Sequence, residues 1–383
     1  MSSLDAASGL DAASALDAAS GLDAASGFDA ASVLDAASGS GARGSAAAAA
    51  LIPHRDGIVG PWKPPTAAWF DELDVEDANQ LARWEPSVRA KVLDFELLSH
   101  LHFAANAGGA PQRTTLWHLN KTTQGTGTVA PKGTYQRFIT ITRPDADKLR
   151  LNQLPYVNGW ADLRQDRARE IIAQKVPQFA FWSSVVPLHP TRTKSTLELI
   201  GLVLRLASSV VQRFKHALCV RRPHEYSPQI QSIIQTPGHG AFPSGHSTEA
   251  FAVARLLIRL IPPQDKTLLE QLIRQAARIA INRTVAGVHY PVDSMAGQLL
   301  GFSVAEYLIA RCRAPTAQGE VDSWNFDGNH QDIEDFSGAE LYDVVGPPPK
   351  RIETTFATKN AVPINVDGSS LLNWLWKKAR SEW

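Results

Sequence analysis

The stretch TPGHGAFPSGHSTEAFAVARLLIRL, residues 236–260, decides how this chain is interpreted. A Pro-Ser-Gly-His turn at residues 243–246 directly precedes a long apolar pattern with helical spacing. Serine is a good helix N-cap and a Pro/Gly pair favours a turn, so the segment predicts a helix start. Backbone N–H groups at a helix start also bind anions, so the same turn predicts an oxyanion site. The remainder of the chain distinguishes these two interpretations.

The composition is that of an ordinary globular protein with no net charge. The 383 residues are 44% hydrophobic and 20% charged, with 38 Lys+Arg against 38 Asp+Glu. Nucleic-acid-binding proteins usually carry a basic excess, so this class is not expected. Any bound anion must therefore be held by a local cluster of cations. The two cysteines, Cys219 and Cys312, are too few for a disulfide scaffold.

The N-terminal segment predicts neither a secretory signal nor a membrane anchor. It lacks a basic region followed by a continuous apolar stretch. No uninterrupted run of about 18 apolar residues is visible elsewhere, because Arg205, Arg255 and Arg259 break the most apolar segments. The sequence therefore predicts a soluble, cytoplasmic protein without a membrane span.

The chain divides into a repetitive tail and one globular domain. A hexapeptide of the LDAASG type repeats over residues 4–38, and residues 1–50 are predicted to be a disordered or weakly helical tail. A multivalent docking peptide is the alternative for this tail. Residues 51–383 predict a single all-α domain, a helical bundle with long loops. Its active-site core is expected over 193–312 and a C-terminal strap over 313–383.

Apolar periodicity gives the expected elements of that domain. Long loops are expected over 107–160, which is rich in Gly, Pro, Thr and Asn, and a short amphipathic helix is expected at the C-terminus. The other expected helices span residues 66–106, 162–175, 193–218, 245–261, 266–284 and 293–311, the last with Asp293 as its N-cap.

Three cations lie on apolar faces of the expected helices. Lys215 and Arg222 share one face, two turns apart, and Arg283 continues the apolar stripe of residues 266–284. Buried cations need counter-charges, and no equally convergent acidic set is visible beside them. A multiply charged oxyanion fits this set, because guanidinium groups bind its oxygens in pairs and lysine adds a point charge.

Two histidines complete the pattern. His246 follows the Ser244-Gly245 turn directly, and its face continues into an apolar stripe. His289 follows Arg283 by six residues, and Asp293 lies four positions further. Asp293 is placed to hydrogen-bond one ring nitrogen of His289, which leaves the other free as a nucleophile or metal ligand.

Together, KHALCVRRP (215–223), PSGH (243–246) and NRTVAGVHYPVD (282–293) resemble the three-part signature of the type 2 phosphatidic acid phosphatase and vanadium haloperoxidase superfamily. All the spacings match, and the one departure is Asn282, where the family usually has Ser. The resemblance implies that His246 is the acid/base and that His289 is the phosphohistidine nucleophile or the vanadium ligand. It also implies that five residues hold the oxyanion: Lys215, Arg222, Ser244, Gly245 and Arg283.

The haloperoxidase branch is the leading prediction from the sequence. The expected solubility, the lack of a signal peptide, and His239 five residues before Ser244 all favour it, because bromide- and iodide-oxidising members carry a second histidine there. The expected cofactor is vanadate, whose site phosphate also fits, with peroxide and bromide or iodide as substrates. A homodimer is expected from the resemblance. The alternatives are a soluble phosphomonoesterase with a phosphohistidine intermediate and a non-catalytic oxyanion-binding scaffold.

Overall fold

The computed structural model describes residues 45–66, 72–106, 111–123, 125–130, 132–176, 178–262, 266–343 and 350–383. The predicted disordered tail lies outside these ranges except for its last six residues. These six residues begin helix α3 (Ser45–Ile58). The division into a tail and a single domain stays a prediction.

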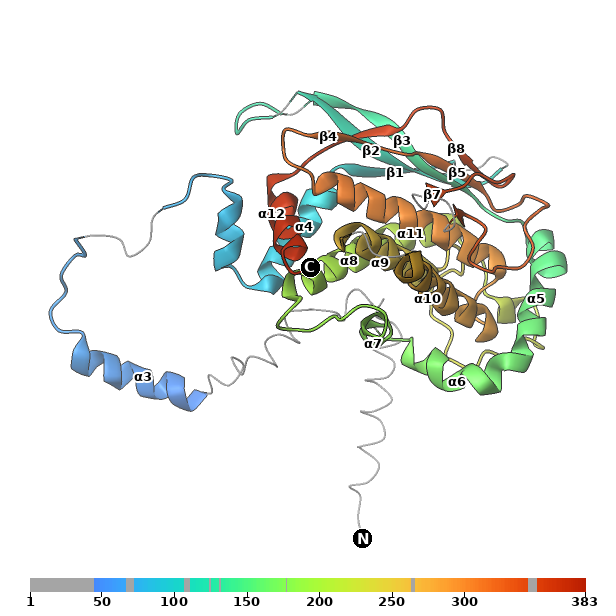
Figure 1. Ribbon diagram of the computed structural model, residues 1–383, viewed down its shortest axis with the longest axis horizontal. Coiled ribbons are helices and arrows are strands. Elements are labelled where there is room, and N and C mark those ends of the chain that lie inside the picture. The colour runs from blue at the N-terminus through green and yellow to red at the C-terminus, as the bar shows by residue number, and fades with distance from the viewer. Residues whose placement is uncertain are drawn as a thin grey trace, which may run out of the picture.

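Four long helices form the centre of the fold (Figure 1). They are α8 (Lys194–Leu218), α9 (Gly245–Leu260), α10 (Lys266–Val285) and α11 (Pro291–Arg311), within two residues of the predicted bounds. Helix α9 contacts the other three, and α11 is buried along almost its whole length. A helix that is apolar on all sides is stable only when other elements surround it, and α11 meets that condition.

Shorter helices surround this centre. Helix α6 follows the predicted 162–175 segment closely. Helix α12 is the predicted C-terminal amphipathic helix, which contacts α8 and has Leu372 and Leu375 buried in the core. A single helix over 66–106 is too long a prediction. In the described part of this range, only residues 78–83 and 86–98 are helical, and residues 101–105 form a strand. The shorter elements are η2 (Ala78–Arg83), α4 (Pro86–Leu98), η3 (Lys148–Gln153), α5 (Leu154–Gly159), η4 (Trp160–Leu163), α6 (Arg164–Ala173), α7 (Phe179–Ser183), η5 (Pro223–Glu225) and α12 (Ser370–Arg380).

The prediction of an all-α fold is wrong, because a five-stranded mixed sheet lies over the helices (Figure 1). Its strand order is β1-β2-β3-β5-β8, with β3 and β5 parallel and the other pairs antiparallel. These strands are β1 (Leu101–Ala105), β2 (Arg113–Thr123), β3 (Lys132–Thr142), β5 (Trp324–Asp327) and β8 (Ala357–Lys359). Two-stranded sheets join β4 (Gln318–Val321) to β9 (Ile364–Asp367), and β6 (Tyr342–Asp343) to β7 (Lys350–Arg351). The fold is therefore α/β.

The predicted loops over 107–160 contain the two longest strands because their polar residues alternate with buried ones. In β2, Thr114, Leu116 and His118 are buried at every second position. This spacing of two is that of a strand with one face against a core. In the same way, the predicted strap over 313–383 supplies the partners β5 and β8 and is part of the sheet.

Candidate active site

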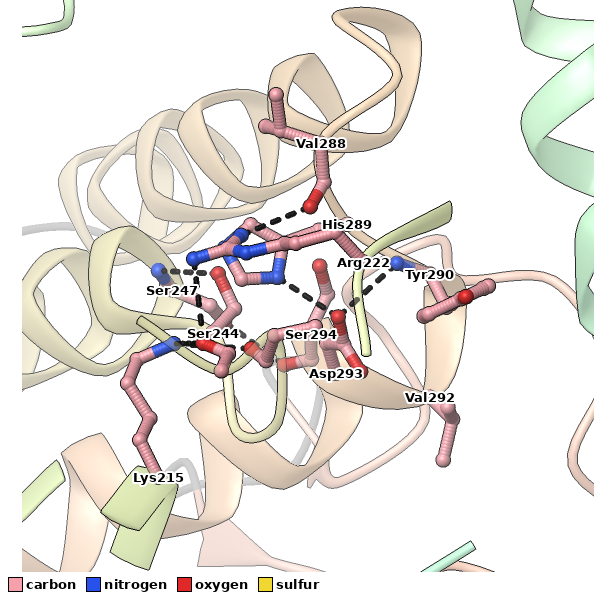
Figure 2. A network of polar contacts seen from close by, with 12 residues as sticks. Lys215, Arg222, Ser244, Ser247, Val288, His289, Tyr290, Val292, Asp293 and Ser294 are labelled. Carbon is pink, nitrogen blue, oxygen red and sulfur yellow. Dashed lines mark hydrogen bonds and ion pairs between the residues drawn. The ribbon is translucent and has the colours of Figure 1, made fainter. Parts of the chain in front are cut away.

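The three predicted cations are all buried around one point, the start of α9. Lys215 in the last turn of α8 and Arg222 just beyond it are each 2% exposed, and Arg283 in the last turn of α10 is 1% exposed. Figure 2 shows Lys215 and Arg222 beside His289 and the Ser244 turn. The structure thus brings together side chains that α8, α9, α10 and α11 carry separately.

Backbone carbonyls surround two of these cations. Lys215 Nζ donates to the carbonyl oxygens of Gly240 and Ala241 at 3.0 and 2.9 Å. The Arg222 guanidinium donates to the carbonyls of His239, Val288 and Gly240 at 3.1, 2.8 and 3.2 Å. Neither the Arg222 nor the Arg283 side chain forms an ion pair with a carboxylate in the described part of the chain. The site therefore keeps an excess of positive charge.

Arg283 has unused donors. Its Nη2 donates to the Ile171 carbonyl at 3.2 Å and to Gln174 Oε1 at 3.1 Å. Its Nε and Nη1 are buried and have no hydrogen-bond partner among the residues that the structure describes. Buried N–H groups are almost always paired in folded proteins, so two orphans on one guanidinium indicate a missing acceptor. A tetrahedral oxyanion supplies oxygens that can accept from both nitrogens of a guanidinium edge.

His289 is oriented by its neighbours so that one nitrogen carries a lone pair. Its Nδ1 lies 2.7 Å from Asp293 Oδ2, and its Nε2 lies 3.0 Å from Arg222 Nη1. Because a guanidinium can only donate, Nε2 accepts, so the ring proton resides on Nδ1 and is donated to Asp293. Burial, followed by the charge of Arg222, lowers the pKa of His289 well below its usual range. His289 is thus a neutral imidazole with its lone pair on Nε2.

Asp293 orients His289 and the start of α11 at once. It is the third residue of α11 and is not the N-cap that the sequence predicts, because its Oδ2 accepts from the Tyr290 N–H at 3.1 Å. Burial raises the pKa of Asp293 to about 7, against the opposing effects of the Tyr290 N–H, Lys215 and Arg222. The two donors that point at Oδ2 require the carboxylate to act as an acceptor.

His246 stands one residue after the N-terminus of α9, and its orientation is fixed by α6. Its Nε2 donates to the Gln174 carbonyl at 3.1 Å, which leaves the lone pair on Nδ1. Burial lowers the pKa of His246 well below its usual range, and the charges of Arg283, Lys215 and Arg222 lower it further. His246 is therefore neutral in the free protein, with these three cations nearby.

The turn at the start of α9 is itself fixed to α11. Ser244 is the N-cap of α9, its side chain accepts from the Ser247 N–H, and its own N–H donates to the Asp293 carbonyl at 2.9 Å. Gly245 is the first helical residue and lies against the Lys215 side chain. The N–H groups of a first helical turn carry a partial positive charge that adds to that of the cations, which further favours an anion there.

Three further polar residues support the site: Gln174, Glu170 and Asn282. The sequence prediction does not include the first two, and it treats Asn282 only as a departure from the family pattern. Gln174 follows α6 and is fully buried, and its Oε1 accepts from Arg283 and from Asn282 Nδ2, the latter at 2.9 Å. Asn282 also donates to Glu170 Oε1 at 2.8 Å, and Glu170 pairs with Arg278. Asn282 thus links Arg283 to α6. No signal in the sequence pairs α6 with these residues, because the contacts are tertiary.

His239 lies beside Arg222, with its Nδ1 3.1 Å from Arg222 Nη2. It therefore lies beside one of the residues predicted to hold the oxyanion. All nine predicted site residues lie close to the start of α9. Their roles stay predictions. The donor set fits phosphate or vanadate, because the Arg222 and Arg283 side chains form no ion pair with a described carboxylate and Arg283 has two N–H groups without a partner among the described residues.

Comparisons with known proteins confirm the superfamily for part of the chain. Residues 197–314 match the model of the PAP2 superfamily. The decaprenylphosphoryl-5-phosphoribose phosphatase of Mycolicibacterium smegmatis is 33% identical over 110 residues, which are 28% of this chain and 56% of that protein. Its namesake from Mycobacterium tuberculosis is 35% identical over 94 residues, 22% of this chain and 45% of that protein. The chain thus spans about half the length of the curated relatives it matches.

Among solved structures, this chain is similar to a transmembrane PAP2 type phosphatidylglycerolphosphate phosphatase from Bacillus subtilis. It has a TM-score of 0.31 and 16% sequence identity, and the match covers 40% of this chain and 80% of that chain. The named relatives are phosphatases, so the prediction of a haloperoxidase is wrong. His239 therefore no longer supports a halide-oxidising reaction. Two expectations stay predictions: that vanadate can occupy the site, and that the chain forms a homodimer.

One segment corrects the predicted localisation. Residues 194–225 contain a helix that is long and apolar enough to cross a membrane by length and composition, with 78% of its most apolar window buried against the rest of the fold. The prediction of a soluble, cytoplasmic chain is therefore wrong, because it rests on the absence of such a segment.

Proposed function

We propose that this chain is a phosphomonoesterase that works through a phosphohistidine intermediate. The observation that carries the proposal is Arg283, a fully buried guanidinium with two unpaired N–H groups beside a neutral imidazole. The phosphatase names of the relatives support the same reaction class. A phosphoryl group placed against Arg283, Lys215 and Arg222 would offset the charge of these three buried cations.

The first step is transfer of the phosphoryl group to His289. Its Nε2 lone pair attacks phosphorus while the bond from phosphorus to the ester oxygen breaks. Arg222 Nη1, which donates to Nε2 in the free site, would release this lone pair by donating to a phosphoryl oxygen instead. Asp293 accepts the hydrogen bond from the Nδ1–H group, which keeps its proton, and so stabilises the positive charge that develops on the ring.

His246 supplies the proton that the leaving oxygen needs. The free imidazole is neutral, because three cations and burial lower its pKa. A phosphate dianion offsets these cations and therefore raises the affinity of His246 for a proton. In the second step, His246 takes a proton from water, the water oxygen attacks phosphorus, and the nitrogen–phosphorus bond breaks to release phosphate and free His289.

The test is hydrolysis of an aryl phosphate by the purified chain. We expect phosphate release that orthovanadate inhibits, because vanadate is also a tetrahedral oxyanion that becomes five-coordinate. The His289→Ala variant should lose at least about 10³-fold in kcat. The His246→Ala variant should lose about 10²- to 10⁴-fold. His216→Ala serves as the matched control, because His216 is exposed and lies on α8 next to Lys215.

Two results would contradict the proposal. Hydrolysis that persists in His289→Ala at the wild-type rate would exclude His289 as the nucleophile. Orthovanadate binding by calorimetry without any hydrolysis of phosphomonoesters would favour the non-catalytic oxyanion-binding scaffold.

A further inference from the structure

A cavity lies at the opposite end of α9 from the candidate active site. It has a volume of about 970 Å³ and is bounded by the last turns of α9, the start of α10, β5, β8, Arg351 of β7, and Arg380 of α12. A smaller hollow of about 240 Å³ shares Arg255, Arg259, Glu306 and Asp322 with it. Arg255 lies nine residues after His246, which is roughly 14 Å along a helix axis. The cavity and the candidate active site share no residue.

One side of this cavity is apolar. It is formed by aliphatic side chains from the end of α9 and the first turns of α10, namely Leu257, Ile258, Ile261, Leu268, Leu269 and Leu272. Small-molecule sites have volumes of about 300–1,000 Å³ and are lined mainly by such side chains. The volume here is at the upper end of that range, which is much more than a small inorganic anion needs.

The other side carries guanidinium groups in excess of their acidic partners. Arg255 Nη2 lies 3.1 Å from Glu306 Oε1, and Arg351 Nη1 lies 3.5 Å from Glu306 Oε2, so two cations share one carboxylate. Asp322 is paired with Lys359 at 2.6 Å. Arg259 makes no hydrogen bond or ion pair with any residue that the structure describes. With Glu353 included, the lining holds three carboxylates against five cations, Arg255, Arg259, Arg351, Lys359 and Arg380, so its positive charge exceeds its negative charge.

Two of these arginines also have unused N–H groups. Arg255 Nε and Arg351 Nε are buried without a hydrogen-bond partner among the described residues. The Arg351 side chain is only 4% exposed and stacks on the Trp324 ring at 4.1 Å, so its position is fixed. Burial lowers the pKa of Arg351 to about 10, and burial together with the charge of Arg255 lowers the pKa of Arg259. An anion placed among these groups would raise the pKa values of both arginines, because it stabilises their charged forms.

We propose that this cavity binds a single-chain anionic amphiphile, with its apolar chain on the aliphatic side and its head group on Arg255, Arg259 and Arg351. The apolar side excludes a bare inorganic anion as the whole ligand, and the unpaired guanidinium N–H groups exclude a neutral chain. A carboxylate and a phosphate head share this chemistry. The site is independent of the proposed phosphatase reaction.

The experiment is calorimetric titration of the full chain with soluble ten-carbon probes, with orthovanadate present in excess to occupy the candidate active site. Decanoate and decyl phosphate distinguish a carboxylate head from a phosphate head, and binding of either supports the proposal. Decanol and inorganic phosphate test the two halves of the ligand separately. We expect each of these to bind at least about tenfold more weakly than the better anionic probe.

Two variants assign the binding to this cavity. Arg259→Gln removes an exposed head-group contact and should weaken anionic-probe binding by about tenfold. Leu269→Ser removes part of the apolar side and should weaken binding of the same probe. Arg274→Gln is the matched control, because Arg274 lies on α10, is 79% exposed and is not among the lining residues. Hydrolysis of an aryl phosphate by all three variants should equal that of the wild type, which shows that the fold is intact.

The proposal is overturned if neither anionic probe binds, or if decanol or inorganic phosphate binds as tightly as the probes. Equal affinities of Arg259→Gln and Arg274→Gln would also overturn it. Loss of phosphatase activity in the wild type would contradict only the proposed function, because the titrations do not depend on turnover.

Discussion

At the scale of single residues, the site is defined by which nitrogen holds each proton. Arg222 can only donate to His289, so the lone pair of that ring is on Nε2. The Gln174 carbonyl can only accept, so the lone pair of His246 is on Nδ1. Both histidines are neutral before an anion arrives, because burial and neighbouring cations lower their pKa values. A bound dianion offsets the neighbouring cations and so raises the pKa values of these histidines.

We therefore predict that the pKa of His246 rises when phosphate or orthovanadate binds. The anion compensates Arg283, Lys215 and Arg222, whose charges now lower that pKa. An increase of about one unit or more is expected, which corresponds to about 1.4 kcal/mol of altered interaction. Histidine NMR titrations with and without the anion measure it, and the His246→Gln variant assigns the signal. A pKa that stays constant or falls would contradict the prediction.

At the scale of elements, the close contact of α9 with α11 determines where the Pro-Ser-Gly-His turn lies. Gly297 of α11 faces the start of α9, and a Cβ atom there would lie 2.7 Å from the Ser244 carbonyl oxygen and 2.7 Å from Ser247 Cβ. Such distances are shorter than any relaxed contact, so the helices can approach this closely only because residue 297 lacks a side chain.

The Gly297→Ala substitution should consequently lower both stability and anion affinity. We expect a loss of about 1–3 kcal/mol in the free energy of unfolding, as for other overpacked cores. Orthovanadate binding should weaken in parallel, since Ser244 must move. The control is Gly159→Ala at the end of α5, where a Cβ would contact nothing within 4 Å. Urea unfolding and calorimetry measure both effects, and equal behaviour of the two variants would refute the argument.

At the scale of the whole molecule, the sheet is held on the helices by buried polar side chains as well as apolar ones. His118 of β2 packs edge-on against Tyr307 of α11 at 5.4 Å and stacks on His100, which follows α4, at 6.2 Å. Burial, followed by the charge of Arg311, lowers the pKa of His100 to about 3 and that of His118 to about 4. Both rings are therefore neutral when the sheet and the helices are in contact.

This arrangement predicts a loss of stability in mild acid. The unfolded chain binds these protons near pH 6.5, whereas the folded chain does not, so stability is complete above that pH and falls below it. Each such histidine contributes at most about 1.4 kcal/mol per pH unit. Between pH 7 and pH 5, the free energy of unfolding of His118→Gln should therefore fall less than that of the wild type. His54→Gln is the control because His54 is exposed, and equal slopes for all three proteins would exclude the prediction.

The sequence alone determined the features that depend on contacts close together in the chain. Helical periodicity predicts α8 to α11 closely, since each helix has its own apolar face. The spacing of four between His289 and Asp293 predicts their contact, since a carboxylate in the first turn of a helix can reach a side chain just before the helix start. The sequence also predicts that Lys215, Arg222 and Arg283 belong to an anion site, since charged groups on apolar helix faces need a counter-charge.

Only the tertiary structure decided the features that join distant segments. Ile139 of β3 pairs with Trp324 of β5, so a sheet is present although its strands look like polar loops when considered separately. Gln174, which follows α6, reaches Arg283 and His246 in the same way, across a contact that no local pattern encodes. A strand or a buried polar group is stable only when its hydrogen-bond partner is present, and those partners are brought into place by folding.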